Sequence, residues 1–191
     1  MSSQEVGDLV SQFEAIAADA KALVEPLPEA VFNRQPASGG WSVGQCMEHL
    51  NITERAMLAN MRPAAQAVQL SGTPASQPTR HGWLMGWFIG TMEPPVKRRI
   101  RTRSGFIPPA TLVKDAVLGE FLRLHQEVLR MLREVDGRDL SAKVQSPFSR
   151  FLRYKLGSAF ALMAAHDRRH LWQARQALAH APAQGPAGGR R

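Results

Sequence analysis

Residues 163–174 read MAAHDRRHLWQA, a polar run inside an otherwise apolar helical pattern. Residues four positions apart on a helix differ in direction by about 40° and lie about 6 Å apart along its axis, so His166 and His170 share one face. Met163, one turn before His166, and Ala174, one turn after His170, place that face on the apolar side of the helix. An inward-facing pair of imidazoles at this spacing favours a shared metal ion, whereas two solvated histidines are the alternative.

Four segments carry the periodicity of amphipathic helices. Apolar residues recur at i, i+3, i+4 and i+7 over residues 3–24, after Ser42, over 112–135 and within 150–180. Gln45 lies three residues after Ser42, which is the capping-box spacing for the start of a helix. The pattern therefore predicts four long helices.

Other residues predict where these helices begin and end. Pro26 and Pro28 are expected to end the first helix, because proline has no backbone N–H. Pro63 is expected to kink or stop the second helix, although the apolar pattern continues beyond it. Thr111 is expected to cap the third helix, and Gly137 to lie at its C-terminal end.

The segments between the helices differ in composition. Residues 25–41 and 71–81 are predicted to be a loop and a linker. Residues 82–92 are apolar but too short to cross a membrane, which needs about 20 residues. We expect this segment to pack on the core or in a dimer. Residues 97–103 hold five basic side chains, and a loop over 104–110 follows.

These features together predict the fold class. Strict alternation of apolar and polar residues over the length of a strand is not evident, and four amphipathic helices favour an all-α protein. We expect a four-helix bundle with a long irregular connection between its second and third helices. Residues 1–180 are expected to form this domain. The Gly-, Pro- and Ala-rich residues 181–191 are expected to be a disordered tail.

The net charge is +8, from 24 Lys and Arg against 16 Asp and Glu in 191 residues. Residues 1–96 carry a net −4 and residues 97–191 a net +12. A basic half favours an anionic small molecule, nucleic acid or an acidic membrane surface, or is simply a solvated helix face. A single cysteine excludes an internal disulfide framework and a Cys-rich zinc module. The N-terminus lacks the pattern of a secretory signal, so we expect a cytoplasmic protein.

Two ligands make a weak metal site, so a third is expected from a facing helix. His49 is the natural candidate, because it lies in the predicted second helix beside the apolar stripe. Three neutral imidazoles leave positions open for water or a substrate. Imidazole suits several divalent ions, of which we expect zinc or nickel, with iron and manganese as alternatives.

Two stretches of this sequence resemble the DinB-like, YfiT-like superfamily of metalloenzymes, a damage-inducible family distinct from the polymerase of that name. Residues 36–50, PASGGWSVGQCMEHL, are similar to the entry to the family's second helix. Residues 166–173, HDRRHLWQ, are similar to the His-x-x-x-His segment of its fourth helix. The resemblance covers about residues 5–180, and the segment at about 70–110 is not part of the family motif.

The resemblance implies an up-down-down-up bundle with a three-histidine metal centre, often in a homodimer. Carried over by position, the ligands would be His49, His166 and His170. Family members of known activity use low-molecular-weight thiols such as bacillithiol or mycothiol. The implied function is therefore a metal-dependent S-transferase, in which the metal lowers the pKa of a thiol that attacks an electrophilic small molecule.

Several neighbouring residues have two interpretations each. Glu48 and Asp167 are expected to be solvated carboxylates, with orientation of a histidine as the alternative. Gln173 contacts either substrate or another helix. His125 is expected to be a hydrogen-bonded core residue rather than a pocket residue, and Cys46 a small buried hydrophobe rather than a ligand.

A second function class stays open beside the enzyme. A non-enzymatic metal-containing binding or stress-response protein could keep the fold and the metal while its basic half contacts an anionic partner. Nucleic acid is a less favoured partner than a small molecule, and attachment to a membrane surface through residues 82–103 is the weakest alternative. The sequence assigns no residue a catalytic role.

Overall fold

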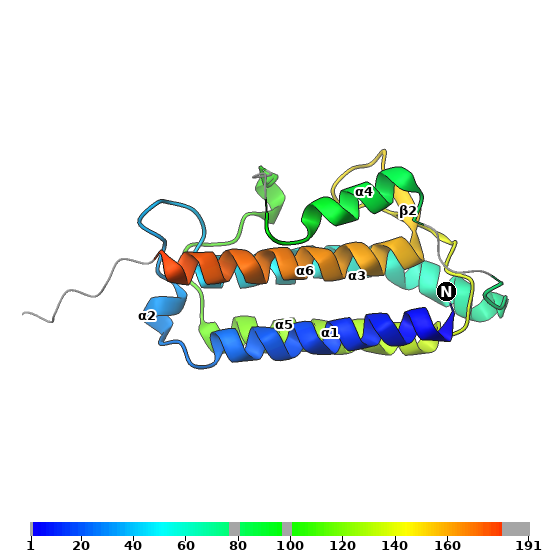
Figure 1. Ribbon diagram of the computed structural model, residues 1–191, viewed down its shortest axis with the longest axis horizontal. Helices are drawn as coiled ribbons and strands as arrows, with labels where there is room; N and C mark the ends of the chain where they lie inside the picture. Colours follow the sequence, from blue (N-terminus) through cyan, green and yellow to red (C-terminus); the bar gives the residue numbers. More distant parts are fainter. Residues whose placement is uncertain (1, 77–80, 97–100, 181–191) are drawn as a thin grey trace, which may run out of the picture.

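The computed structural model describes residues 2–76, 81–96 and 101–180. The protein is mostly helical, and its long helices are α1 (Ser3–Val24), α3 (Val43–Ser71), α5 (Lys114–Glu134) and α6 (Leu156–Ala179). They form two layers, α1 with α5 and α3 with α6 (Figure 1). α1 also packs on α6, and α3 on α5, so each long helix contacts two others.

Shorter elements lie at the ends and on one side of these layers. α4 packs along the outer side of α6, and α2 lies at the end of the molecule where α6 finishes (Figure 1). A small antiparallel hairpin precedes α6, with Val144 opposite Tyr154. The bounds of these elements are α2 Glu29–Phe32, α4 Trp83–Met92, the 3-10 helix η1 Ser104–Phe106, β1 Lys143–Gln145 and β2 Arg153–Lys155.

The starts of α1 and α3 follow from local sequence. Ser42 caps α3, its hydroxyl accepting from the backbone N–H of Gln45 while the Gln45 side chain accepts from the backbone N–H of Ser42. Ser2 and Glu5 form the same reciprocal pair at α1. Each capping box satisfies N–H groups that a helix start leaves without partners. The predicted helix over residues 3–24 and the predicted capping box are confirmed.

Pro63 does not stop its helix, which was the open alternative, and the predicted start of the third long helix is wrong. α3 runs through Pro63 to Ser71, because Ala65 and Val68 bury the turns beyond the proline and so hold them against the core. α5 begins at Lys114 without a side-chain cap, not after Thr111.

Leu112, which precedes α5, is held by a contact with a residue far away in the sequence. The Asn33 side chain accepts from the backbone N–H of Leu112 at 3.0 Å and donates to its carbonyl at 2.8 Å. This reciprocal pair holds Leu112 just before the N-cap of α5, Val113, whose backbone is extended. Gly137 adopts a φ of 66°, but the C-cap of α5 is Val135.

The connection between α3 and α5 is more ordered than predicted. It contains α4, which was expected only as an apolar packing segment, and η1. The hairpin before α6 was also not predicted, because strands of three residues are too short to show an alternating pattern. The predicted tail at 181–191 lies outside the described residues, as do three of the five basic side chains of 97–103.

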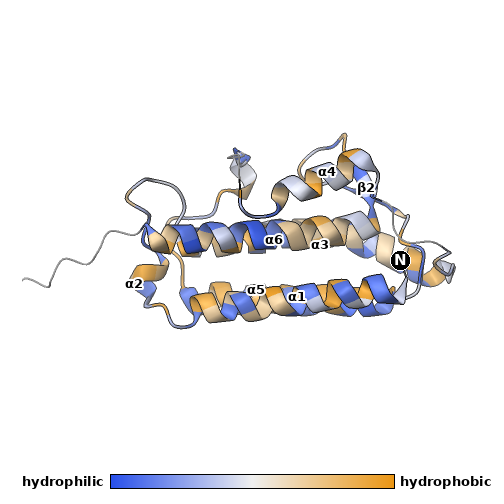
Figure 2. Ribbon diagram, in the orientation of Figure 1, coloured by the Kyte–Doolittle hydropathy of each residue, from blue (hydrophilic) through white to orange (hydrophobic). Residues whose placement is uncertain are grey.

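α1, α3 and α5 each expose one face, whereas most of α6 is buried, and Figure 2 shows hydrophilic and hydrophobic residues mixed along the long helices. The core includes the fully buried Phe13, Phe32, Phe121 and Phe160. Along the described segments, no helix combines the length and the apolar character needed to cross a membrane.

α2 packs closely on the start of α3, the helix that carries His49. A Cβ atom built on Gly44 would lie 2.7 Å from the ring of Phe32, which is fully buried. Only glycine therefore allows the Phe32 ring to lie on this turn of α3, two positions after the capping serine.

We predict that Gly44→Ala destabilises the protein by about 1–3 kcal/mol, because the added methyl group overpacks a buried contact. The matched control is Gly119→Ala on the exposed face of α5, where a Cβ meets nothing within 4 Å. That change should stabilise the helix by up to about 1 kcal/mol. Urea unfolding of both variants measures the difference, and equal stabilities would contradict the packing argument.

Candidate metal centre

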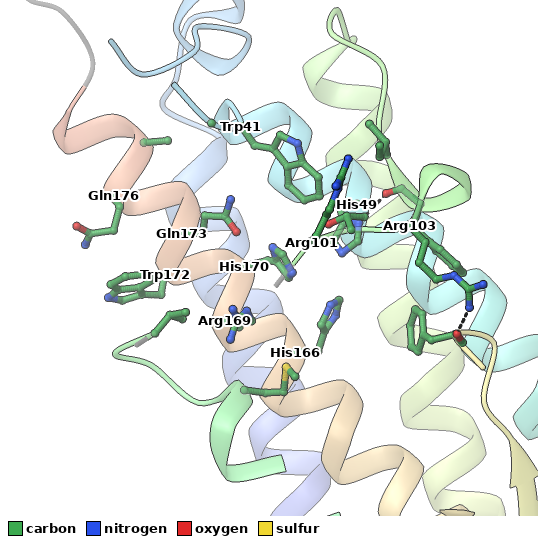
Figure 3. A pocket seen from close by; sticks show the side chains of 18 of the residues that line it. Trp41, His49, Arg101, Arg103, His166, Arg169, His170, Trp172, Gln173 and Gln176 are labelled. Atoms are coloured by element: carbon green, nitrogen blue, oxygen red, sulfur yellow. Dashed lines mark hydrogen bonds between the residues drawn. The ribbon is translucent and has the colours of Figure 1, made fainter. Parts of the chain in front are cut away.

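The imidazoles of His49, His166 and His170 meet between α3 and α6. One nitrogen from each ring lies within 4.8 Å of one from each of the others. The ring centroids are 5.3 Å apart for His49 and His166, 4.5 Å for His49 and His170, and 4.6 Å for His166 and His170. Figure 3 shows the three rings pointing into one space. The structure thus brings together the three histidines that the sequence singled out.

A backbone carbonyl orients the first of these rings. Nδ1 of His49 lies 2.8 Å from the carbonyl oxygen of Phe106. A carbonyl oxygen can only accept, so Nδ1 carries the proton and Nε2 keeps a free lone pair. This is the arrangement common among metal-binding histidines, in which one nitrogen donates to the protein and the other binds the ion.

The three imidazoles are held in the neutral form. Burial, followed by the neighbouring imidazole of His49 and the charge of Arg169, lowers the pKa of His166 to about 3. Burial and then the other two imidazoles lower the pKa of His170 well below its ordinary value. Burial also lowers the pKa of His49, although the Phe106 carbonyl opposes this effect. Neutral imidazole is the form that binds metal ions.

Nδ1 of His170 is buried and makes no hydrogen bond of normal geometry to a described residue, although Gln173, one turn on, lies near enough to interact with the ring. A buried polar atom without a partner costs free energy, so such atoms are rare in folded proteins. The three rings therefore fit a bound cation, which would give a partner to a nitrogen that the protein alone leaves unsatisfied.

The triad lines a cavity of about 1060 Å³. The indole of Trp41 covers one side of the triad, 4.8 Å from the ring of His49 and 5.9 Å from that of His170. Trp172 and Gln173 of α6 line the same cavity (Figure 3). The cavity thus combines aromatic walls, which suit an organic ligand, with a polar centre.

Three arginines give the cavity a positive character. Arg101, Arg103 and Arg169 all line it. Arg169 is 7% exposed and donates to the backbone carbonyl of Thr91 at 3.2 Å, which ties the end of α4 to α6. Arg103 donates to the backbone carbonyl of Phe148 (Figure 3). A cavity with these guanidinium groups favours anionic ligands.

The structure places the neighbouring residues that had two interpretations each. The Glu48 side chain is 17% exposed, less solvated than expected, and it accepts from Asn51 and Arg55. Cys46 is fully buried, burial raises the pKa of its thiol, and it does not belong to the triad. Gln173 lines the cavity. Asp167, in contrast, is fully buried rather than solvated.

His125 was expected to be a core residue with a hydrogen bond. It is a core residue with no exposed surface, and it does not line the cavity. However, neither of its ring nitrogens makes a hydrogen bond to a described residue. The expectation of a core histidine is confirmed, and its ring nitrogens face the carboxyl groups of Glu54 and Asp167 at 3.4 Å and 3.6 Å.

Sequence reasoning missed the contributions of Trp41, Arg169 and the Phe106 carbonyl. Trp41 lies just before the capping serine, and its position in the quoted motif is the signal that could have indicated it. Arg169 lies between the two helix histidines but was treated as part of the basic half. The Phe106 carbonyl has no sequence signal, because any residue could supply it.

We predict that the metal-free protein loses stability as the pH falls below about 6.5. An unfolded histidine has a pKa of about 6.5, so the unfolded state binds a proton that the folded His166, with its pKa of about 3, does not bind. Each such proton changes the free energy of unfolding by about 1.4 kcal/mol per pH unit. The stability is present above this pH and is lost on acidification.

Urea unfolding of chelator-treated protein between about pH 7 and pH 5 tests this prediction. The variant His166→Gln removes one titrating group, so its stability should fall less steeply than that of the wild type. Parallel curves for the two proteins would contradict the depressed pKa of His166.

The chain was compared with known protein families and proteins. Residues 12–174 match the DinB superfamily, whose members often bind metal. Neither the curated proteins nor the solved structures compared with the chain gave a match. The family match covers both motifs that carried the resemblance in the sequence. On this evidence, and with the histidines brought together as the motifs suggested, the chain belongs to the DinB superfamily.

Proposed function

We propose that the protein holds a divalent metal ion through His49, His166 and His170. The observation that carries this proposal is the hydrogen bond from His49 Nδ1 to the Phe106 carbonyl, because it leaves Nε2 free beside the other two rings. Zinc and nickel fit three neutral imidazoles best, with iron and manganese as alternatives. The proposal includes the up-down-down-up four-helix bundle that the family resemblance implies.

We further propose that the site serves a metal-dependent thiol S-transferase. A divalent ion bound there would lower the pKa of a low-molecular-weight thiol and so make its nucleophilic thiolate available at neutral pH. The three histidines hold the ion, and the Phe106 carbonyl keeps the His49 ring in place. Trp41 shields one side of the triad from water, while the open cavity admits an electrophilic small molecule.

The arginines support an anionic thiol or substrate. Arg101 is exposed at the cavity wall, and no described residue forms an ion pair with it. Arg169 is fixed by the Thr91 carbonyl at the level of the triad. A carboxylate or phosphate group on the ligand would find these guanidinium groups while its reacting end lies near the histidines.

The alternative function is a non-enzymatic binding or stress-response protein that keeps the metal. The same arginines favour this alternative, because they would also contact an anionic partner that undergoes no reaction. The two functions differ in whether thiol is consumed.

We also propose that the protein forms a homodimer through α4. Trp83, Leu84 and Trp87 are 85%, 66% and 60% exposed, while Phe88 and Ile89 pack against the core. Large apolar side chains gathered on one exposed helix face are typical of an interface between subunits. A cytoplasmic location also remains part of the proposal.

We predict that His166→Ala lowers the bound metal by one ion per chain, because two imidazoles hold a divalent ion too weakly to survive dialysis. Metal is measured by elemental analysis after saturation with zinc or nickel and dialysis. The matched control is His81→Ala, which removes a histidine that does not line the cavity but contacts Ser158, and which leaves the triad intact. Equal metal content in the wild type and His166→Ala would overturn the metal site.

We predict that the metal-loaded protein accelerates the reaction of a low-molecular-weight thiol with chlorodinitrobenzene or a bimane above the rate without protein. His166→Ala should abolish the acceleration, and His81→Ala, outside the cavity, should keep most of it. Absence of acceleration across several thiols and metals would reject the transferase and favour the binding protein. Binding of that protein to DNA would then show a steep salt dependence.

A further inference from the structure

A second cluster of metal-binding side chains lies in the core, outside the cavity. It consists of Glu54 of α3, His125 of α5 and Asp167 of α6. The three residues are 1%, 0% and 0% exposed, and none of them lines the cavity. Ionisable side chains are almost never buried so deeply unless they are paired or bind a metal ion.

The distances from the His125 ring nitrogens to the carboxyl oxygens are longer than those of normal hydrogen bonds. Nδ1 of His125 lies 3.4 Å from Oε2 of Glu54, and Nε2 lies 3.6 Å from Oδ2 of Asp167. None of the six side-chain nitrogen and oxygen atoms makes a hydrogen bond of normal geometry within the described part of the chain. The carboxyl groups of Glu54 and Asp167 lie close enough to each other to share a hydrogen bond when one of them is protonated, and burial raises the pKa of both.

The described neighbours of the core cluster are aromatic rings or side chains that are paired elsewhere. The rings of Phe13 from α1 and Phe121 from α5 pack on His125, with centroids 5.6 Å and 4.1 Å away. The next residue of α6, Arg168, directs its guanidinium to Glu93 and Gln12 instead. Two carboxyl groups and an imidazole are therefore enclosed by apolar rings, where isolated charge is most costly.

A divalent cation resolves this arrangement. Its charge would balance two carboxylates, and it would give one atom of each side chain the partner that the protein lacks. One ligand atom from each residue lies within 4.8 Å of the others. Two ligands bound at about 2.1 Å to one ion are separated by at most about 4.2 Å, so small side-chain movements complete the site. Helical proteins commonly build such sites from Glu, Asp and His on facing helices.

We propose that Glu54, His125 and Asp167 form a second divalent cation site in the core, separate from the histidine triad. One imidazole and two carboxylates suit zinc, manganese or iron. This site joins three of the four long helices, whereas the triad joins two. The core cation would therefore act on the stability of the fold, and it would exchange slowly because it lies away from the cavity.

The experiment compares zinc content in four proteins refolded with zinc and then dialysed. They are the wild type, His166→Ala, Glu54→Gln and the double variant. The proposal expects two, one, one and no ions per chain. It is overturned if His166→Ala holds no zinc, or if Glu54→Gln holds as much as the wild type. Circular dichroism and gel filtration confirm that each variant folds.

Failure of the triad and failure of the core site give different results. If His166→Ala keeps the wild-type zinc content and Glu54→Gln loses an ion, the core site stands without the triad. If only the triad ion is found, the core cluster holds protons instead, and the proposal fails. Where Glu54→Gln does not fold, Glu54→Met replaces it, because an apolar residue of similar size is often tolerated at a buried charged position.

Two further measurements do not depend on counting ions. In the His166→Ala background, zinc should raise the Tm, because a ligand that binds only the folded state stabilises it. A chromogenic chelator should remove triad zinc quickly from native wild type and core zinc only slowly or on unfolding. A single fast phase in the wild type, or no Tm change with zinc in His166→Ala, would overturn the proposal.

Discussion

The packing of α6 is the constraint on which the rest of the structure depends. α1, α3, α4 and both strands contact this helix, so nearly every direction around its middle turns faces protein. Successive residues on a helix point about 100° apart. The five residues 166–170 therefore face different parts of the protein. His166 and His170 face the cavity, and Asp167 lies in the core. Arg168 reaches the side of α1 and α4, and Arg169 reaches the end of α4. One polar segment thus organises both candidate sites.

The sequence predicts the parts of this arrangement that depend on helix geometry. The four-residue spacing of His166 and His170, with apolar residues one turn away, places both on a buried face. The capping box at Ser42 fixes the start of α3, and from there the position of His49 follows. These features are local, so their spacing along the chain carries the information.

The remaining features depend on contacts between distant segments. The Asn33 side chain holds Leu112, just before α5, from 79 positions away, and the sequence near residue 112 gives no sign of this contact. Asp167 was expected to be solvated because it is charged and follows a histidine. Its burial becomes clear only when Glu54 and His125 are placed beside it, because their pairing spans three helices. The short hairpin before α6 has too few residues to show a period.

The connection between α3 and α5 contributes both a backbone group and side chains to the site. The family match spans this connection. Its Phe106 carbonyl orients His49, and Thr91 of α4 receives the guanidinium of Arg169. The Phe106 contact uses a backbone oxygen, so many sequences in this connection can keep the histidine oriented. Arg101 and Arg103, in contrast, line the cavity with their side chains, so a substitution of either would change the charge of the cavity. Variation of the connection can therefore change which ligand enters while the three histidines keep their positions.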